Sequence, residues 1–413
     1  MHRIMLCAVA LATASASQAQ DDLKKLEQRV DELEGRVQAA AQASNRPQSE
    51  SALNPAVSVI LNGVYANLSR DPASYRINGF IPTTGDVAPP RRGFSLGESE
   101  LALAANVDPM FRGTLIAAIS PDNDSIGVEE GYLQTLAMPR GFTVKAGRFF
   151  SAVGYQNQVH AHAWDFTDAP LALRAFLGGQ LGEDGVQLRW LAPTSFYWDV
   201  GTELGRGRAF PANVSPSGKN GAGSLTFFTH WGGDVGDSTA WQAGLSHLRA
   251  NPANRAFNDV GASGAPMTNT FTGTSRLWAV DGVLKWSPSG NPTEKNLKLQ
   301  GEYFRRSEEG TLTLDTAGAA LSSGLSSRQS GWYAQSVYQF RPQWRAGYRY
   351  DELSPGTVDA KPKRHSVMVD WNPSEFSRIR LQLARDYSRM NEPDTQVFVQ
   401  YILSLGAHGA HRF

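Results

Sequence analysis

Beyond the first 56 residues, apolar and polar side chains alternate along the chain with a period of two. In 295–305, for example, Leu297 and Leu299 share one face, whereas Lys298 and Gln300 share the other. Such alternation predicts β-strands that are apolar on one side and polar on the other. We expect sixteen strands, each of about ten residues, at 57–68, 94–107, 110–120, 126–138, 142–150, 185–193, 196–206, 224–232, 239–249, 275–287, 295–305, 331–341, 344–352, 364–372, 376–388 and 395–406.

The connections between these segments fall into two alternating classes. Every second connection is short and rich in turn residues, as at Pro193-Thr194-Ser195. Most of the others are longer, namely 69–93, 151–184, 207–223, 250–274, 306–330 and 353–363. Outer-membrane barrels have short periplasmic turns and long outer loops. The pattern therefore predicts an all-β fold, a sixteen-stranded antiparallel transmembrane β-barrel over 57–413, with a large soluble β-protein as the alternative.

The first 56 residues follow a different pattern. Residues 1–19 combine a positive start, an apolar stretch and a small-residue cleavage site, so we interpret them as a signal peptide. Residues 20–44 carry a heptad seam from Leu23 to Ala40, which predicts a short periplasmic coiled-coil helix. A lone amphipathic helix is the alternative. Residues 45–56 are polar and contain proline, as expected of a linker.

Composition narrows the class of protein further. The 39 Lys and Arg balance the 39 Asp and Glu, which gives no support to a nucleic-acid partner. The sequence lacks an apolar run long enough for a spanning helix. It also lacks a G-x-S-x-G elbow and a P-loop, so we expect neither an enzyme nor a cofactor. The one cysteine, Cys7, lies within the signal peptide and predicts no disulfide in the mature chain.

One connection stands out by its length and its apolar residues. Residues 151–181 include Trp164, Phe166, Leu171 and Phe176, which makes them too apolar for a solvated loop. Long connections without regular structure are usually functional lids or disordered linkers, and this composition is not that of a disordered segment. We therefore predict that 151–181 folds inward and forms the constriction of the barrel.

The polar faces of sixteen strands would line an aqueous lumen. The basic wall positions that we single out are Arg345, Arg349, Arg378, Arg380, Lys298 and Arg189. The inward loop contributes the acids Asp165 and Asp168. An acidic loop opposite a basic wall would create a transverse field that sets ion selectivity. The alternative, which is compatible with the first, is that these residues form ion pairs that brace the wall.

Two histidines lie two residues apart in the inward loop, His160 and His162. A pair of imidazoles is a candidate ligand set for zinc or copper. A second pair, His408 and His411, lies near the C-terminus. Incidental histidines are the alternative. If the first pair binds metal, the alternative function is a channel or receptor for a transition metal such as zinc.

The last predicted strand and the terminal Phe413 resemble the recognition signal of bacterial outer-membrane proteins. With the signal peptide, coiled coil and sixteen strands, the chain resembles the bacterial porins. The GRFF segment at 147–150, followed by an inward loop, is most similar to the phosphate-selective porin family. The resemblance implies a Gram-negative outer-membrane homotrimer, surrounded by lipid, for passive diffusion of small hydrophilic solutes or ions, anions such as phosphate among them. It leaves the solute and the ion preference open.

Overall fold

The computed structural model describes residues 55–83, 87–119, 125–214, 220–260, 266–316, 319–356 and 358–406. The predicted signal peptide, the coiled-coil helix, nearly all of the linker and Phe413 lie outside the described residues. Within these ranges, no helix is long and apolar enough to cross a membrane.

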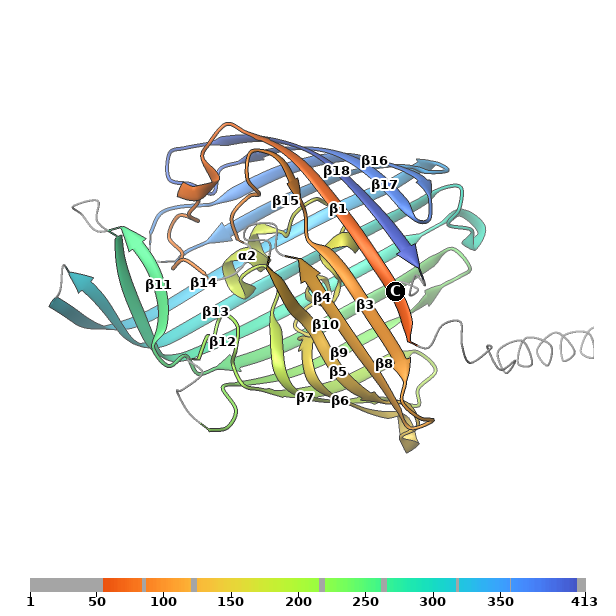
Figure 1. Ribbon diagram of the computed structural model, residues 1–413, viewed down its shortest axis with the longest axis horizontal. Coiled ribbons are helices and arrows are strands. Elements are labelled where there is room, and N and C mark those ends of the chain that lie inside the picture. Colours follow the sequence, from red (N-terminus) through yellow and green to blue (C-terminus); the bar gives the residue numbers. More distant parts are fainter. Residues whose placement is uncertain are drawn as a thin grey trace, which may run out of the picture. The chain divides into compact units, whose positions relative to one another are not determined.

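The described residues form an antiparallel β-barrel (Figure 1). Its strand segments are β1 (Ala56–Leu68), β2 (Gly93–Leu96), β3 (Ser99–Asn106), β4 (Phe111–Ile119), β5 (Ile126–Thr135), β6 (Phe142–Phe150), β7 (Gly182–Leu191), β8 (Tyr197–Gly205), β9 (Ser224–Val235), β10 (Thr239–Ala250), β11 (Arg255–Val260), β12 (Pro266–Trp286), β13 (Asn296–Thr316), β14 (Ala319–Arg341), β15 (Trp344–Ser354), β16 (Lys363–Ser374), β17 (Ser377–Asp386) and β18 (Asp394–Gly406). The helices are α2 (Leu171–Leu177) and the 3-10 turns η1 (Pro72–Ser74), η2 (Pro139–Gly141), η3 (Gln156–Gln158), η4 (Ala161–Ala163) and η5 (Pro288–Gly290).

These segments occupy sixteen strand positions in the described part of the chain. The segments β2 and β3 both pair with β1 and so share one position, and β10 and β11 both pair with β12. The barrel closes where β1 pairs with β18, with Ser58 opposite Gly406. The predicted fold class is therefore confirmed, and each of the sixteen predicted segments overlaps a strand position.

Two of the predicted long loops are wrong. Most of 306–330 and much of 250–274 belong to strands, because β12, β13 and β14 extend to 21, 21 and 23 residues. Much of the extension, such as the Ser-rich stretch 322–330, is polar on both faces and shows no clear alternation. Its pairing combines hydroxyl contacts, such as Thr313 Oγ1 and Ser322 Oγ at 2.9 Å, with apolar pairs such as Leu314 opposite Leu321.

Side chains alternate between the outside and the inside of the barrel as the sequence predicts. On β17, Leu381 and Leu383 are exposed outward, whereas Arg380 and Gln382 are fully buried inside. Exposed large apolar side chains recur on the outer face of most strands. Such an exterior suits contact with hydrocarbon rather than with water.

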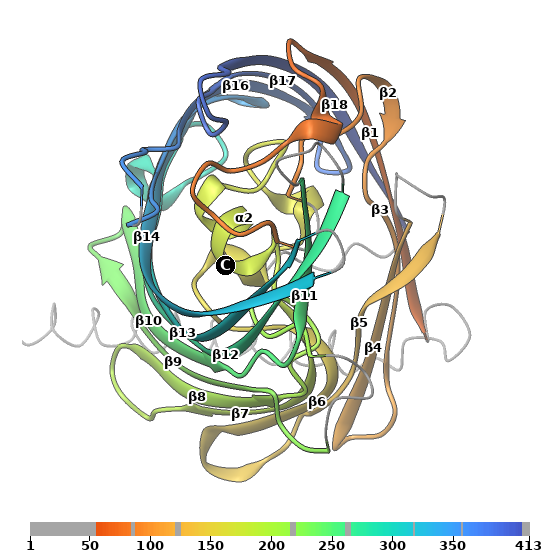
Figure 2. The ribbon, with the colours of Figure 1, turned by 90° about the vertical axis from the view of Figure 1, so that its left-hand side faces the viewer.

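Residues 151–181 lie inside the barrel, where Figure 2 shows α2 surrounded by the strands. The helix ends at Gly178, whose φ of 70° favours glycine. Its apolar side chains join one buried cluster with the inner faces of the wall and with the 69–92 connection: Leu171, Leu173, Phe176, Leu177, Leu248, Leu277, Phe304, Tyr333, Leu353, Tyr75, Ile77 and Phe80. Burying each large side chain contributes about 1.5–3 kcal/mol, so this packing holds the loop against one side of the wall.

Candidate functional site

The inward loop is closed at its base by one asparagine. The side-chain nitrogen of Asn157 donates to the carbonyl oxygens of Ser151 (2.8 Å) and Leu181 (3.1 Å). The amide of Leu181 donates back to Asn157 Oδ1 at 2.6 Å. Asn157 is fully buried. Because both ends of the loop are joined in this way, residues between them are presented to the wall as one folded unit.

Asp165 connects the loop to two neighbouring parts of the wall. Its carboxylate lies 2.9 Å from Lys298 Nζ on β13 and 3.2 Å from Arg345 Nη1 on β15. Gln335 on β14 donates a further hydrogen bond at 3.2 Å. Burial alone would raise the pKa of Asp165, but the charges of Lys298 and Arg345 outweigh burial and hold the pKa well below its usual range. The carboxylate is therefore ionised at neutral pH.

Asp168 joins the inward loop to two arginines of the wall and to Arg174 of α2. Its carboxylate oxygens lie 2.8 Å from Arg174 Nη2, 2.8 Å from Arg349 Nη2 and 2.5 Å from Arg364 Nη1. All three guanidinium groups are almost fully buried. Burial alone would raise the pKa of Asp168, but Arg364, Arg174 and Arg349 together hold it well below its usual range.

The two arginines of β17 bind the loop backbone. Arg380 Nη2 donates to the carbonyl of Trp164 at 2.8 Å, and Arg378 Nη1 donates to the same oxygen at 3.2 Å. Arg380 also pairs with Asp370 at 2.7 Å, and Arg345 pairs with the same carboxylate. Arg349 and Arg380 are thus fully buried in contacts that hold the loop, in line with the bracing alternative.

A second group of basic side chains faces inward but remains partly exposed. The exposed side-chain fractions are 24% for Arg189, 22% for Lys298, 18% for Arg345 and 23% for Arg378. Lys145 and Lys285 are also partly exposed. Each lies within a few residues of a short turn, so the group occupies one end of the barrel. The carboxylates beneath them, such as Asp199 and Asp370, are buried.

Solvent reaches the inward faces of some strands and not of others. Inward side chains of β4, β5 and β6 such as Thr114, Gln134 and Lys145 are partly exposed. Those of β16 and β17, such as Ser366 and Gln382, are fully buried beneath the loop. The loop therefore covers the inner faces of β16 and β17, whereas the inner face of β4 and the short-turn ends of β5 and β6 are in contact with solvent. Farther along β5 and β6, Glu130 and Phe149 are buried.

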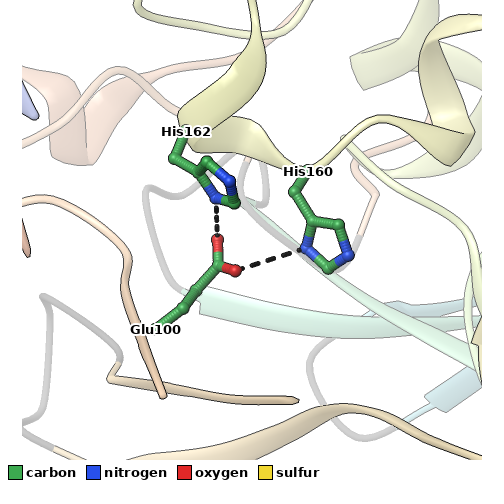
Figure 3. A group of neighbouring side chains, drawn as sticks. All are labelled: Glu100, His160 and His162. Carbon is green, nitrogen blue, oxygen red and sulfur yellow. Dashed lines mark hydrogen bonds and ion pairs between the residues drawn. The ribbon is translucent and has the colours of Figure 1, made fainter. Parts of the chain in front are cut away.

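Beside these strands the predicted histidine pair, which is partly exposed, meets a buried acid from the wall (Figure 3). His162 Nδ1 lies 2.7 Å from Glu100 Oε1, and His160 Nδ1 lies 3.4 Å from Glu100 Oε2. His160 also lies 3.3 Å from Glu129 and 3.0 Å from Glu130. Burial alone would lower the pKa of His160, but the surrounding carboxylates of Glu129, Glu130 and Glu100 raise this pKa well above its usual value.

The structure brings most of the candidate residues together in two groups. Asp165, Asp168 and the basic wall residues form one, and the histidine pair forms the other with Glu100. Arg189 makes only a long contact with the loop, 3.4 Å from Nη2 to Gln158 Oε1, and pairs instead with Asp199. Sequence reasoning missed Arg364, although its period-two position with Ser366 places it on the inner face. His408 and His411 lie outside the described residues.

No family model matches the chain. The solved structures that it resembles include a loop L8 deletion mutant of OmpT from Vibrio cholerae (12% identity, TM-score 0.52, 84% of this chain and 98% of that chain). The outer-membrane channel DcaP of Acinetobacter baumannii gives 12% identity and a TM-score of 0.51, over 86% and 99% of the two chains. An anion-selective porin from Comamonas acidovorans gives 10% and 0.50, over 84% and 98%. At these identities the likeness shows the fold alone, which is that of the outer-membrane porins and channels.

One protein is similar to this chain in sequence as well. An uncharacterized protein of Aquifex aeolicus is 32% identical over 351 residues, which cover 78% of this chain and 71% of that protein. The chain therefore belongs to the same family as the Aquifex aeolicus protein, and its described residues have the porin fold.

Proposed function

We propose that the protein forms a water-filled channel in the outer membrane through which small hydrophilic solutes diffuse passively, with a preference for anions such as phosphate. The observation that carries the preference is the partly exposed basic group at the short-turn end of the barrel, with its paired carboxylates buried beneath it. Charged side chains that line a pore determine which ions enter it.

Burial decides which charges a passing solute meets. Arg345 and Lys298 share Asp165, and the basic atoms of this set remain partly exposed while the carboxylate is almost covered. A solute therefore meets nitrogen donors before it meets carboxylate oxygens. Guanidinium groups present a planar fork that matches phosphate and carboxylate. Because water and salt screen these charges, the preference is a ratio of permeabilities and not an exclusion of cations.

A planar-bilayer measurement tests the proposal. The purified protein should give discrete single-channel steps, and a salt gradient should give a reversal potential on the anion side. The double variant Arg189→Gln with Lys285→Gln should move the reversal potential toward cations. Arg305→Gln, whose side chain is exposed on the outer face of β13, is the matched control and should leave it unchanged. The proposal would be refuted if the parent gave a reversal potential on the cation side or produced no conductance steps in the bilayer.

The lengths of the connections between strands support an orientation of the barrel in the membrane. We propose that the short turns face the periplasm and that the extended β13–β14 hairpin faces the outside, as in barrels with short periplasmic turns. Ser322→Cys on this hairpin should react with a membrane-impermeant maleimide on intact cells, and Thr194→Cys should react only after the outer membrane is opened. Equal labelling of both positions on intact cells would contradict this orientation.

We also propose that the chain assembles as a homotrimer with its coiled coil, residues 20–44, in the periplasm. The heptad seam supports association, and OmpT of Vibrio cholerae, which shares the fold, is described in a trimer form. Light scattering of the detergent-solubilised protein should give three chains per particle. Deletion of 20–44 should lower the temperature at which the particle dissociates. A parent particle of one chain would contradict the proposal.

A further inference from the structure

The cluster of Glu100, His160 and His162 combines side chains from two distant parts of the sequence. Glu100 lies on β3, and the two histidines flank Ala161 in the inward loop, where the 3-10 turn η4 begins (Figure 3). One ligand atom from each residue lies within 4.8 Å of the other two. Two imidazoles and a carboxylate are a donor set that suits zinc and similar divalent ions.

The distances are close to those that a bound ion requires. Zinc binds nitrogen and oxygen at about 2.0–2.2 Å, so neighbouring ligand atoms of a tetrahedral site lie about 3.3 Å apart. Glu100 Oε2 lies 3.4 Å from His160 Nδ1, and Glu100 Oε1 lies 2.7 Å from His162 Nδ1. The ligand atoms of the two histidines lie within 4.8 Å of each other, so side-chain rotations that bring them closer would admit an ion in place of the present contact between His162 Nδ1 and Glu100.

A fourth donor and an orienting acid are already in position. Glu129 Oε2 lies 3.3 Å from His160 Nδ1, yet within the described residues neither atom has a hydrogen-bond partner of acceptable geometry. The other nitrogen of His160 donates to Glu130 Oε2 at 3.0 Å. Glu130 is itself held by the amide of Phe150 at 3.1 Å. A carboxylate that orients the second nitrogen of a ligating histidine is typical of metal sites.

We propose that Glu100, His160 and His162 bind a divalent transition-metal ion, with Glu129 as a further ligand and Glu130 as the positioning residue of His160. Binding is coordination by these side chains and involves no change of oxidation state. The bound ion would join the inward loop to β3 on the side of the barrel that solvent reaches. A second consequence, which rests on the proposed channel function, is that occupancy narrows the passage and lowers conductance.

Titration calorimetry of the full-length protein with Zn²⁺ tests the site without any measurement of transport. The parent should bind one ion per chain. Glu100→Gln and His162→Gln, which keep the size of the side chain, should each weaken binding at least tenfold, and Glu130→Gln by about ten- to a hundredfold. His365→Gln, whose ring lies on the outer face of β16 beside Tyr348, should bind as the parent does. Visible absorption of bound Co²⁺ should report nitrogen and oxygen ligands in the parent and change in His162→Gln.

Two results would overturn the site. One is the absence of saturable Zn²⁺ binding in the parent. The other is binding that survives in Glu100→Gln and His162→Gln but disappears when His408 and His411 are replaced by Gln.

Conductance measurements test whether the bound ion narrows the passage, separately from whether the ion binds. Micromolar Zn²⁺ should lower the single-channel conductance of the parent and leave that of His162→Gln unchanged, and a chelator should reverse the effect. Binding by calorimetry with unchanged conductance would overturn the narrowing of the passage alone. A parent protein that forms no channel would refute the proposed function, whereas the calorimetric test of the site would stand.

Discussion

Replacing Asp168 by asparagine should release the inward loop from the wall. The substitution keeps the size of the side chain and one oxygen acceptor but removes the charge that faces three buried guanidinium groups. Arg349 keeps Asp351 at 3.1 Å, and Arg364 keeps Asp386 at 3.9 Å. Arg174 has no other carboxylate among the ion pairs of the described residues. Removing one partner of a buried pair costs about 3–5 kcal/mol, and the remaining carboxylates favour the lower end.

A cost of about 3 kcal/mol corresponds to a roughly hundredfold change in an equilibrium constant. The change should appear in hydrogen exchange of loop amides that bind the wall, because exchange reports the free energy of local opening. Two such amides are Thr167, which donates to Gln382, and Leu171, which donates to Asp351, each at 2.8 Å. In Asp168→Asn, exchange of peptides covering these amides should accelerate by about two orders of magnitude.

Asp184→Asn is the matched control. Asp184 pairs with Arg148 at 2.6 Å, but the two side chains are 31% and 29% exposed. A partly exposed pair contributes about 1 kcal/mol or less, so exchange of the loop should change by less than about fivefold. If Asp168→Asn folds and its loop amides exchange as slowly as those of the control, Asp168 does not anchor the loop and the reasoning from burial is wrong.

Three further predictions concern pH, backbone strain and selectivity. Because the folded-state pKa of Asp165 is lowered, its stabilising contribution is full above about pH 4 and declines as pH falls toward the folded value. The pKa of His160 in the same loop is raised, so its contribution is full below about pH 6 and declines as pH rises toward the folded value. Loop exchange, corrected for its intrinsic rate, should therefore stay constant from about pH 6 to 5, and release of the loop within that range would contradict this. Gly147→Ala should lower the free energy of unfolding in denaturant titrations by about 1–3 kcal/mol, because φ is 129° and the added Cβ would lie 2.2 Å from a backbone oxygen. Gly113→Ala is the control and should be close to neutral, because the nearest atoms to its added Cβ lie 4.0 Å away. Arg378→Gln should shift the reversal potential toward cations. Arg380→Gln, at a fully buried position, should chiefly accelerate hydrogen exchange of the loop. Equal shifts of the reversal potential in the two variants would contradict the distinction between exposed and buried arginines.

The strands of the barrel were predictable because one physical requirement repeats along the chain. Each strand separates an apolar exterior from a polar interior, and the side chains must alternate to satisfy both. The prediction failed where that requirement ends. The outer parts of β12–β14 are rich in Ser, Thr and Gly, as in the stretch 322–330, and the one clear alternation of β13, at 311–315, spans only five residues.

The sequence was enough to identify most residues of the site but not the side chains that they contact. Alternation places Arg349 and Arg380 on the inner face, but it does not reveal that the loop covers them completely. Burial depends on which strands the apolar side chains of α2 pack against, and that is a property of the closed barrel. In the same way, the spacing of His160 and His162 indicates a ligand pair, whereas Glu100 joins them only because β3 and the loop meet in space.

An inward loop tied to strands that follow it in the chain constrains the order of folding. Asp165 and Asp168 bind side chains of β13, β15 and β16, all of which are synthesised after the loop. The seam between β1 and β18 joins the two ends of the barrel, so it has the largest sequence separation and the greatest entropic cost of closure. Once the seam is paired, the lumen is enclosed and the buried ion pairs are sealed within it. We therefore expect the loop to dock on the curved, still open sheet, where it acts as a template that sets the curvature of the wall before the last strand pairs with the first.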